Sequence, residues 1–174
     1  IKPKARWLGL NLLCELDDEG EYWLNRTSGV LYLIPVGGAN AITAAHVNLV
    51  VSVNATAVNS SASNVRFEAL TVMHSQANGI ELNGDNITVD NCTSTNHGAI
   101  GIQISGVNNT VVQCDIHDVG CAGIAVKSGV RQADLIWGNS TMMHNTIHRN
   151  SLWKRMYQPG IAFDSVGDRF EHNT

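Results

Sequence analysis

The chain repeats itself every 22 residues between Asn64 and Gly129, and this period limits the folds that are open to it. Units open at Asn64, Asn86 and Asn108, and each one contains the pattern Gly-Ile-x-aliphatic. Self-similarity at a fixed period of about 20 to 50 residues is typical of a solenoid, in which each repeat packs against the next. The Gly-Ile pattern recurs as Gly79-Ile80-Glu81-Leu82, Gly101-Ile102-Gln103-Ile104, Gly123-Ile124-Ala125-Val126 and, after a longer interval, Gly160-Ile161-Ala162-Phe163.

The residues inside each unit select one kind of solenoid. Apolar and polar residues alternate at period two, and Val, Ile and Thr are frequent, as short strands require. No segment has an apolar stripe long enough for a helical repeat, and the leucine spacing of leucine-rich repeats is missing. A coil of about 22 residues holds three short strands and three turns, and coils stack as parallel strands ~4.8 Å apart. We therefore predict an all-β fold, a right-handed parallel β-helix.

Alignment of the units predicts which side chains lie above one another inside the coils. Stacked like residues bury aliphatic surface at roughly 25 cal/mol per Å², so a core runs along the axis. Asn in such a column needs hydrogen-bond partners among neighbouring amides or the turn backbone. The column of glycines predicts either positive φ or close backbone approach. The predicted inward columns are Leu70-Cys92-Cys114-Asn145-Asn173, Val72-Ser94-Ile116-Ile147, Ile80-Ile102-Ile124-Ile161 and Leu82-Ile104-Val126-Phe163.

Composition excludes several classes of function. The 174 residues carry a net charge of −4 and few aromatic side chains. The chain therefore lacks the basic stripe and the aromatic stacking surfaces that nucleic-acid-binding proteins use. No apolar run approaches the ~20 residues of a membrane span, because polar residues interrupt positions 41–53. The chain starts at Ile1 without a signal segment and stops at Thr174 inside a coil, so we expect it to be part of a longer protein.

Residues 1–38 differ in kind from the repeats. Two strand-like runs, residues 21–24 and 30–34, flank a turn ending at Gly29, which predicts a β-hairpin with this glycine at positive φ. Residues 11–16 read as either a short helix or a strand. We expect residues 1–38 to cap a β-helix formed by residues 39–174, whose first coil is irregular. Two insertions, at 127–139 and 150–158, should become loops.

A family resemblance rests on two segments. Residues 11–32, NLLCELDDEGEYWLNRTSGVLY, resemble a segment of the form NLLEELDxPGEWYLDRxTGxLY in right-handed β-helix proteins of the pectin-lyase-like superfamily. The repeats and residues 157–164, YQPGIAFD, are similar to the same group. The chain departs from the pattern at Cys14, where Glu is usual, and at Glu19, where Pro is usual. The resemblance implies the architecture, and its nearest members are glycoside hydrolases, although lyases, epimerases, tailspikes and adhesins share the fold.

Asp164 is the candidate catalytic residue. It directly follows the last Gly-Ile-x-aliphatic strand, and an insertion that bears Trp153 and Tyr157 precedes it. Carboxylates one coil apart suit a retaining glycosidase, and carboxylates two coils apart suit an inverting one. Lys127 aligns with Asp164 one coil earlier, so a surface ion pair is the alternative interpretation.

The predicted substrate contacts are outward residues near this insertion. Individually each could be a solvated turn residue. A calcium-assisted lyase site is disfavoured because the acidic residues are scattered over several columns, and a zinc site because no suitable His or Cys spacing occurs. We therefore expect no metal and no cofactor. The predicted contacts are Asp118, His117, His148, Arg149, Trp153 and Tyr157.

Cysteines and sequons bear on the compartment. Cys92 and Cys114 align in one inward column, which favours buried free thiols over a disulfide, and Cys14 and Cys121 have no obvious partner. The Asn-x-Ser/Thr tripeptides exceed the roughly two or three expected from composition, which favours a secreted, glycosylated chain. Alternatively, β-helix turns favour Asn and strands favour Thr for structural reasons. The sequons start at Asn25, Asn54, Asn59, Asn86, Asn91, Asn108 and Asn139.

Two functions follow from these observations. The first is a secreted, carbohydrate-active β-helix protein, similar to glycoside hydrolases, that binds polysaccharide along an outer face. The second is a non-catalytic extracellular structural or adhesive glycoprotein of a wall, sheath or filament. We expect no nucleic-acid partner and no membrane span.

Overall fold

The computed structural model describes residues 11–38, 63–130 and 135–174, together with the backbone of Val51–Asn54. The chain divides into two compact units, Ile1–Thr43 and Ala44–Thr174. The cap role predicted for residues 1–38 stays a prediction. In the described ranges, no helix has the length and apolar character needed to cross a bilayer.

The first unit contains the predicted hairpin. Strands β1 (Tyr22–Asn25) and β2 (Val30–Leu33) pair antiparallel, with Asn25 opposite Val30. The turn between them depends on Asn25, whose Oδ1 accepts hydrogen bonds from the backbone N of Thr27 and of Ser28. Gly29 has φ +74°, as expected. The open question over residues 11–16 is resolved by a single 3₁₀ turn, η1 (Leu13–Glu15); a second one, η2 (Val36–Gly38), follows β2.

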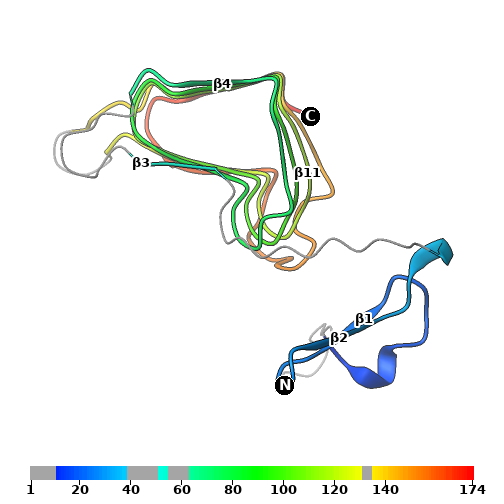
Figure 1. Cartoon of the computed structure of the whole chain (residues 1–174). Coiled ribbons are helices and arrows are strands. Elements are labelled where there is room, and N and C mark those ends of the chain that lie inside the picture. Colours follow the sequence, from blue (N-terminus) through cyan, green and yellow to red (C-terminus); the bar gives the residue numbers. More distant parts are fainter. Residues whose placement is uncertain (1–10, 39–50, 55–62, 131–134) are drawn as a thin grey trace. The chain divides into compact units, whose positions relative to one another are not determined.

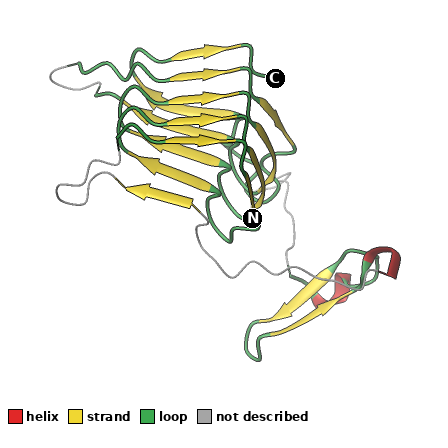
Figure 2. Ribbon diagram, turned by 45° about the horizontal axis from the view of Figure 1, so that its top comes forward, coloured by secondary structure: helices red, strands yellow, loops and turns green. Residues whose placement is uncertain are grey.

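The second unit is a parallel β-helix, as predicted. Figure 1 looks along its axis, so that successive coils superpose, and Figure 2 shows the same strands stacked side by side. Each complete coil contributes one strand to each of three parallel sheets. The strands are β3 (Val51–Asn54), β4 (Arg66–Glu68), β5 (Thr71–Met73), β6 (Ile80–Asn83), β7 (Thr88–Asp90), β8 (Thr93–His97), β9 (Ile102–Ser105), β10 (Thr110–Val112), β11 (Asp115–Val119), β12 (Ile124–Ser128), β13 (Thr141–Met143), β14 (Thr146–His148), β15 (Ile161–Ser165) and β16 (Arg169–Glu171).

The three sheets have the register that the repeat predicts. Sheet 1 is β3-β6-β9-β12-β15, sheet 2 is β4-β7-β10-β13-β16, and sheet 3 is β5-β8-β11-β14. In sheet 1, Ile102 pairs with Ile80 on one side and with Ile124 on the other. Ile124 then pairs with Ile161 across the insertions, which therefore lie outside the ladder. In the first coil, β3 pairs in register with β6, whereas the other residues expected to make this coil irregular, 39–50 and 55–62, lie outside the described residues.

The predicted inward columns form the core, except at its two ends. Ile80, Ile102 and Ile124 are at most 1 % exposed. Leu70 and Phe163 keep the register of their predicted columns but are 45 % and 60 % exposed, so they are not buried as the rest of these columns is. Leu70 directly precedes β5, and Phe163 lies in β15. Both strands are at the edge of their sheet and have a described neighbour on one side only. A column buries a side chain fully only when a coil lies on both sides of it.

Polar side chains inside the coils find partners, as predicted. Asn145 donates from Nδ2 to the carbonyl of Val111 at 3.0 Å and accepts from the backbone N of Cys114 at 3.0 Å. Asn173 repeats the arrangement, with Nδ2 donating to the carbonyl of Met142 at 2.9 Å. In the same column Cys114 is a free thiol, and burial raises its pKa to about 11. Such a thiol is inert toward oxidation and exchange.

The glycine column exists because backbones approach closely. None of its members has positive φ. A Cβ placed on Gly101 would lie 2.4 Å from Ile116 Cγ2 and 2.7 Å from the carbonyl oxygen of Gly123. The sharp corner between sheets 3 and 1 leaves no room for a side chain, so only glycine is accommodated. Gly160 is the exception, because its nearest neighbour would be Ile147 Cγ2 at 3.6 Å.

This column gives a prediction about stability. Gly101→Ala should lower the free energy of unfolding by about 1 to 3 kcal/mol, because its methyl group would overlap both a packed side chain and the adjacent backbone. Urea denaturation followed by circular dichroism measures the change. Gly160→Ala is the matched control, and we expect it to cost less than about 0.5 kcal/mol. Equal effects of the two substitutions would contradict the close-approach explanation.

A buried histidine lies against this column. His97 is 2 % exposed, and its Nδ1 accepts a hydrogen bond from the backbone N of Ser75 at 3.2 Å. The proton therefore resides on Nε2, which is buried without a hydrogen-bond partner. Burial lowers the pKa of His97 from 6.5 to about 4. The fold thus holds this imidazole in its neutral form.

His97 should make the β-helix sensitive to acid. Between pH 6.5 and 4 the unfolded chain takes up a proton that the folded chain excludes, so the free energy of unfolding falls as the pH falls. The loss should be on the order of 1 to 3 kcal/mol, and it should be complete below about pH 4. Urea denaturation of wild type and His97→Gln across this range measures it. A slope that is identical in the two proteins would exclude His97 as the cause.

Candidate functional site

The predicted site residues lie on two different outward faces. Asp164 is in β15 of sheet 1, where its register neighbour one coil earlier is Lys127. Asp118 and His117 are in β11 of sheet 3, and His148 is in β14 of the same sheet. The chain turns a corner between β11 and β12, so residues of the two sheets face different directions (Figure 1). Asp164 and the histidine cluster therefore belong to separate candidate sites.

Two tryptophans lie at the corners that bound sheet 1. Trp153 lies against Gly120, between β11 and β12, since a Cβ on that glycine would be 2.4 Å from Cδ1 of the indole. Trp137 lies against Gly167, between β15 and β16, where a Cβ would be 2.4 Å from Cε3. The absence of side chains at these glycines lets each indole lie on the backbone of a turn. One tryptophan thus lies at each end of strands β12 and β15.

Both indoles keep much of their surface in solvent. Trp153 is 50 % exposed and Trp137 is 60 % exposed. The backbone N of Trp153 donates to the carbonyl of Gly120 at 3.0 Å, which holds the 150–158 loop at this corner. Tyr157, in the same loop, is 90 % exposed. Trp137, Trp153 and Tyr157 are therefore the aromatic side chains of these two insertions that are accessible to a ligand.

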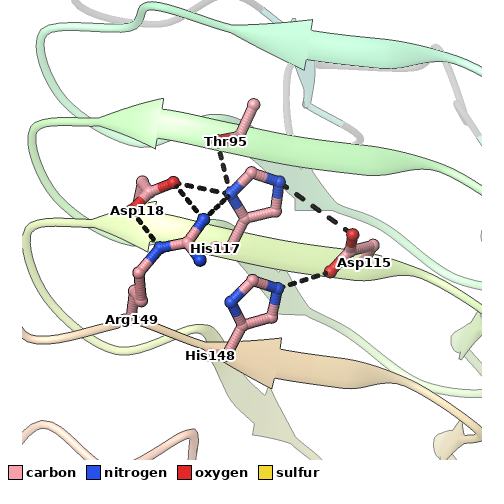
Figure 3. A network of polar contacts seen from close by, with 6 residues as sticks. All are labelled: Thr95, Asp115, His117, Asp118, His148 and Arg149. Atoms are coloured by element: carbon pink, nitrogen blue, oxygen red, sulfur yellow. Dashed lines mark hydrogen bonds and ion pairs between the residues drawn. The ribbon is translucent and has the colours of Figure 1, made fainter.

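On sheet 3, an ion pair connects neighbouring coils. Arg149 donates from Nε to Oδ1 of Asp118 at 2.6 Å and from Nη2 to Oδ2 at 2.7 Å (Figure 3). Both residues have positive φ and occupy equivalent positions in successive coils, Asp118 within β11 and Arg149 directly after β14. The Arg149 hydrogen bonds hold the pKa of Asp118 well below its ordinary range. Asp118 is therefore a fixed anion and cannot serve as a general acid near neutral pH.

This fixed carboxylate determines the tautomer of His117. Nδ1 of His117 lies 2.8 Å from Oδ2 of Asp118, which can only accept, so Nδ1 carries the proton. The hydroxyl of Thr95 lies 3.0 Å from the same nitrogen, and Nη2 of Arg149 lies 3.3 Å away. In the neutral ring, Nε2 of His117 is then a free lone pair.

A second imidazole and a second carboxylate complete the cluster. The rings of His117 and His148 are stacked, with centroids 4.9 Å apart and planes 12° apart. Oδ1 of Asp115 lies 3.3 Å from Nε2 of His148, and Oδ2 lies 3.9 Å from Nε2 of His117. Asp115 pairs in register with Thr93 and Thr146, so this acidic group occurs once in its column.

Four of the six predicted contact residues therefore lie together, whereas Trp153 and Tyr157 occupy the corner between the two faces. Their proposed roles remain predictions. Sequence reasoning missed Thr95, Asp115 and Trp137. The alternation of β11 contained a signal for Asp115, because it lies two positions before His117 and hence on the same side of the strand. Trp137 had only its place in the 127–139 insertion as a signal.

The sequons that can be placed occupy structural turns. Asn86, Asn108 and Asn139 are exposed at the corner between sheets 1 and 2 and have positive φ, and Asn91 has the same conformation at the corner between sheets 2 and 3. The side chain of Asn25 shapes the hairpin turn. Asn54 lies in β3, and Asn59 is outside the described residues. The face of sheet 3 carries none of the placed sequons. Their glycosylation stays a prediction.

Comparison with known families agrees with this architecture. A family model described as the right-handed β-helix region matches residues 34–174. The chain belongs to the right-handed β-helix family. Searches of curated proteins and of solved structures gave no significant match. Membership in the β-helix family defines the fold and leaves activity to be argued from the sites.

The Asp118 ion pair gives a prediction about titration. Arg149→Gln should raise the pKa of Asp118 toward the ordinary value of an aspartate, because the variant removes the hydrogen bonds that stabilise the ionised form. NMR titration of the side-chain carboxyl carbon measures this pKa. Arg66→Gln, which removes a comparable ion pair with Asp90 on sheet 2, should leave it unchanged. A pKa that stays low in Arg149→Gln would show that another group holds Asp118 ionised.

Proposed function

We propose that this β-helix is a secreted, carbohydrate-active protein, similar to glycoside hydrolases, that binds polysaccharide across the outward face of β12 and β15. The observation that supports this most strongly is the pair of half-exposed indoles, Trp137 and Trp153, at the two ends of these strands. The apolar faces of sugar rings pack on aromatic side chains, so a polysaccharide chain could rest on both indoles at once.

The surface between the tryptophans is suited to an extended chain. The outward residues of β12 and β15 include Ala125 and Ala162, which are small and paired in register. Lys127 and Asp164 follow them on the same face and provide polar groups that can bind hydroxyls. Strands of five residues span roughly 17 Å, which is long enough for several sugar rings.

Hydrolysis requires a second carboxylate. In the column of Asp164 the preceding positions are Lys127 and Ser105, so the described coils place no carboxylate one or two coils before it. Glu81 is three coils away, in the neighbouring column. The two carboxylates of a glycosidase are about 5 to 9.5 Å apart, so a partner for Asp164 would come from outside the described part of sheet 1. Binding is thus supported more directly than cleavage.

Secretion is supported by the density of sequons. Glycans at Asn86, Asn108 and Asn139 would project from the corner between sheets 1 and 2 and leave the middle of the strands accessible. The second candidate function, a non-catalytic structural or adhesive glycoprotein, is favoured by the register of Asp164 with Lys127. That register fits a surface ion pair as well as a catalytic group.

The binding proposal predicts the effect of removing the indoles. Trp153→Ala and Trp137→Ala should each weaken binding to a polysaccharide by at least about fivefold, since a central aromatic contact contributes more than about 1 kcal/mol. Affinity electrophoresis against a panel of soluble plant and bacterial polysaccharides measures this. Tyr22→Ala, which removes an exposed aromatic ring of the hairpin unit, is the control. Loss of binding in the control alone would place the site elsewhere.

A separate variant tests catalysis. Asp164→Asn should retain binding and lower hydrolysis of the bound polysaccharide by more than about 100-fold, as expected for loss of an essential acid or base. Reducing-end release over several hours measures hydrolysis. Unchanged hydrolysis in Asp164→Asn would remove this residue from the mechanism. Binding without any hydrolysis by the wild type would favour the non-catalytic function.

A further inference from the structure

The 150–158 loop, which connects β14 to β15, exposes a run of apolar side chains. All six residues from Leu152 to Tyr157 are exposed, and four of them are large apolar or aromatic residues. Met156 is 69 % exposed and Tyr157 is 90 % exposed. Apolar surface that polar groups border is typical of a contact with a protein or a membrane.

The base of this loop is fixed to the β-helix. Asn150 donates from Nδ2 to the carbonyl of Gln158 at 3.2 Å, and the hydroxyl of Ser151 donates to the same carbonyl. Oε1 of Gln158 accepts a hydrogen bond from the backbone N of Ala122 at 3.0 Å. In Figure 1 the loop, drawn in orange, projects beyond the corner of the preceding coils. The closed base therefore holds the side chains of residues 152–157 in solvent.

The same loop is positively charged. Lys154 and Arg155 are exposed, and neither forms an ion pair with a described residue. The preceding coils have no charged residue at this corner, which residues 98–100 and 120–122 form. Screening at physiological ionic strength limits the reach of exposed charges to about 8 Å. The loop thus attracts anions locally, although the chain as a whole carries a net charge of −4.

We propose that the 150–158 loop docks onto an anionic lipid surface. Met156 and Tyr157 enter the headgroup region, and Lys154 and Arg155 lie beside the acidic headgroups. Tyrosine is enriched at the interface between membrane and water, and each Lys or Arg close to an anionic leaflet adds to the attraction. The contact is peripheral and does not rest on polysaccharide binding at sheet 1.

The size and composition of the loop favour lipid over a sugar or a protein. Leu152 and Met156 are aliphatic, whereas sugar rings pack on the faces of aromatic side chains. A stable protein interface uses roughly 20 to 30 residues from each partner, far more than the exposed run 152–157 supplies. A bilayer requires no complementary shape, and interfacial segments enter it by only about 5 to 10 Å. A short apolar loop with two cations meets this requirement.

Co-sedimentation of the full chain with unilamellar vesicles tests the proposal. We expect binding to vesicles of equal parts phosphatidylglycerol and phosphatidylcholine, little binding to phosphatidylcholine alone, and weaker binding as NaCl is added. Lys154→Gln and Arg155→Gln should each weaken binding about fivefold, and the double variant about 30-fold. Met156→Ser and Tyr157→Ser should each weaken it at least about fivefold, because less apolar surface leaves water. Circular dichroism confirms that each variant is folded.

Two exposed residues outside the loop provide matched controls. Arg26→Gln and Met73→Ser remove the same kinds of side chain elsewhere and should leave vesicle binding unchanged. No binding to the mixed vesicles, or equal binding to both kinds of vesicle, would overturn the proposal. Unchanged binding by the Lys154 and Arg155 double variant would also overturn it. Full binding by both Met156→Ser and Tyr157→Ser would do so too, because charge alone would then explain the contact and an acidic polysaccharide or protein would be the better partner.

Discussion

Parallel hydrogen bonding between equivalent residues of successive coils is the interaction on which the whole β-helix depends. It places Ile102 between Ile80 and Ile124 and so makes a continuous core from coils that could not bury their side chains alone. The same register stacks outward residues, which is why His148 lies over His117 although 30 residues separate them along the chain. Core and candidate sites thus have one geometric origin.

The fold was predictable because the repeat specifies register directly. The exceptions, Leu70 and Phe163, arise from position in the stack, and no pattern within one unit encodes whether a further coil lies beside it. The glycine column was recognised, but the choice between positive φ and close approach required the positions of Ile116 and of the next backbone. Short-range alternation predicts the direction of a side chain, whereas contact distances depend on the corner geometry.

The candidate sites were predictable in part. Alignment brought His117, Asp118, His148 and Arg149 together correctly, because they share columns or adjacent turns. Alignment did not separate Asp164 from this cluster. Both lie close to the Trp153 loop along the chain, and the sequence does not show that the chain turns from sheet 3 to sheet 1 between them. Asp115 was missed because its column otherwise holds threonine. Alignment of the repeats cannot identify a site residue that occurs in only one of them.

The stacking of equivalent residues can be tested directly in solution. Nuclear Overhauser spectroscopy on protein with ¹³C-labelled isoleucine methyl groups reports which side chains are in contact. Stacked coils should give cross-peaks between Ile80 and Ile102 and between Ile102 and Ile124, with none between Ile80 and Ile124, which lie two coils apart. Resolved methyl signals that lack the first two cross-peaks would contradict the stacked coils and both outward sites.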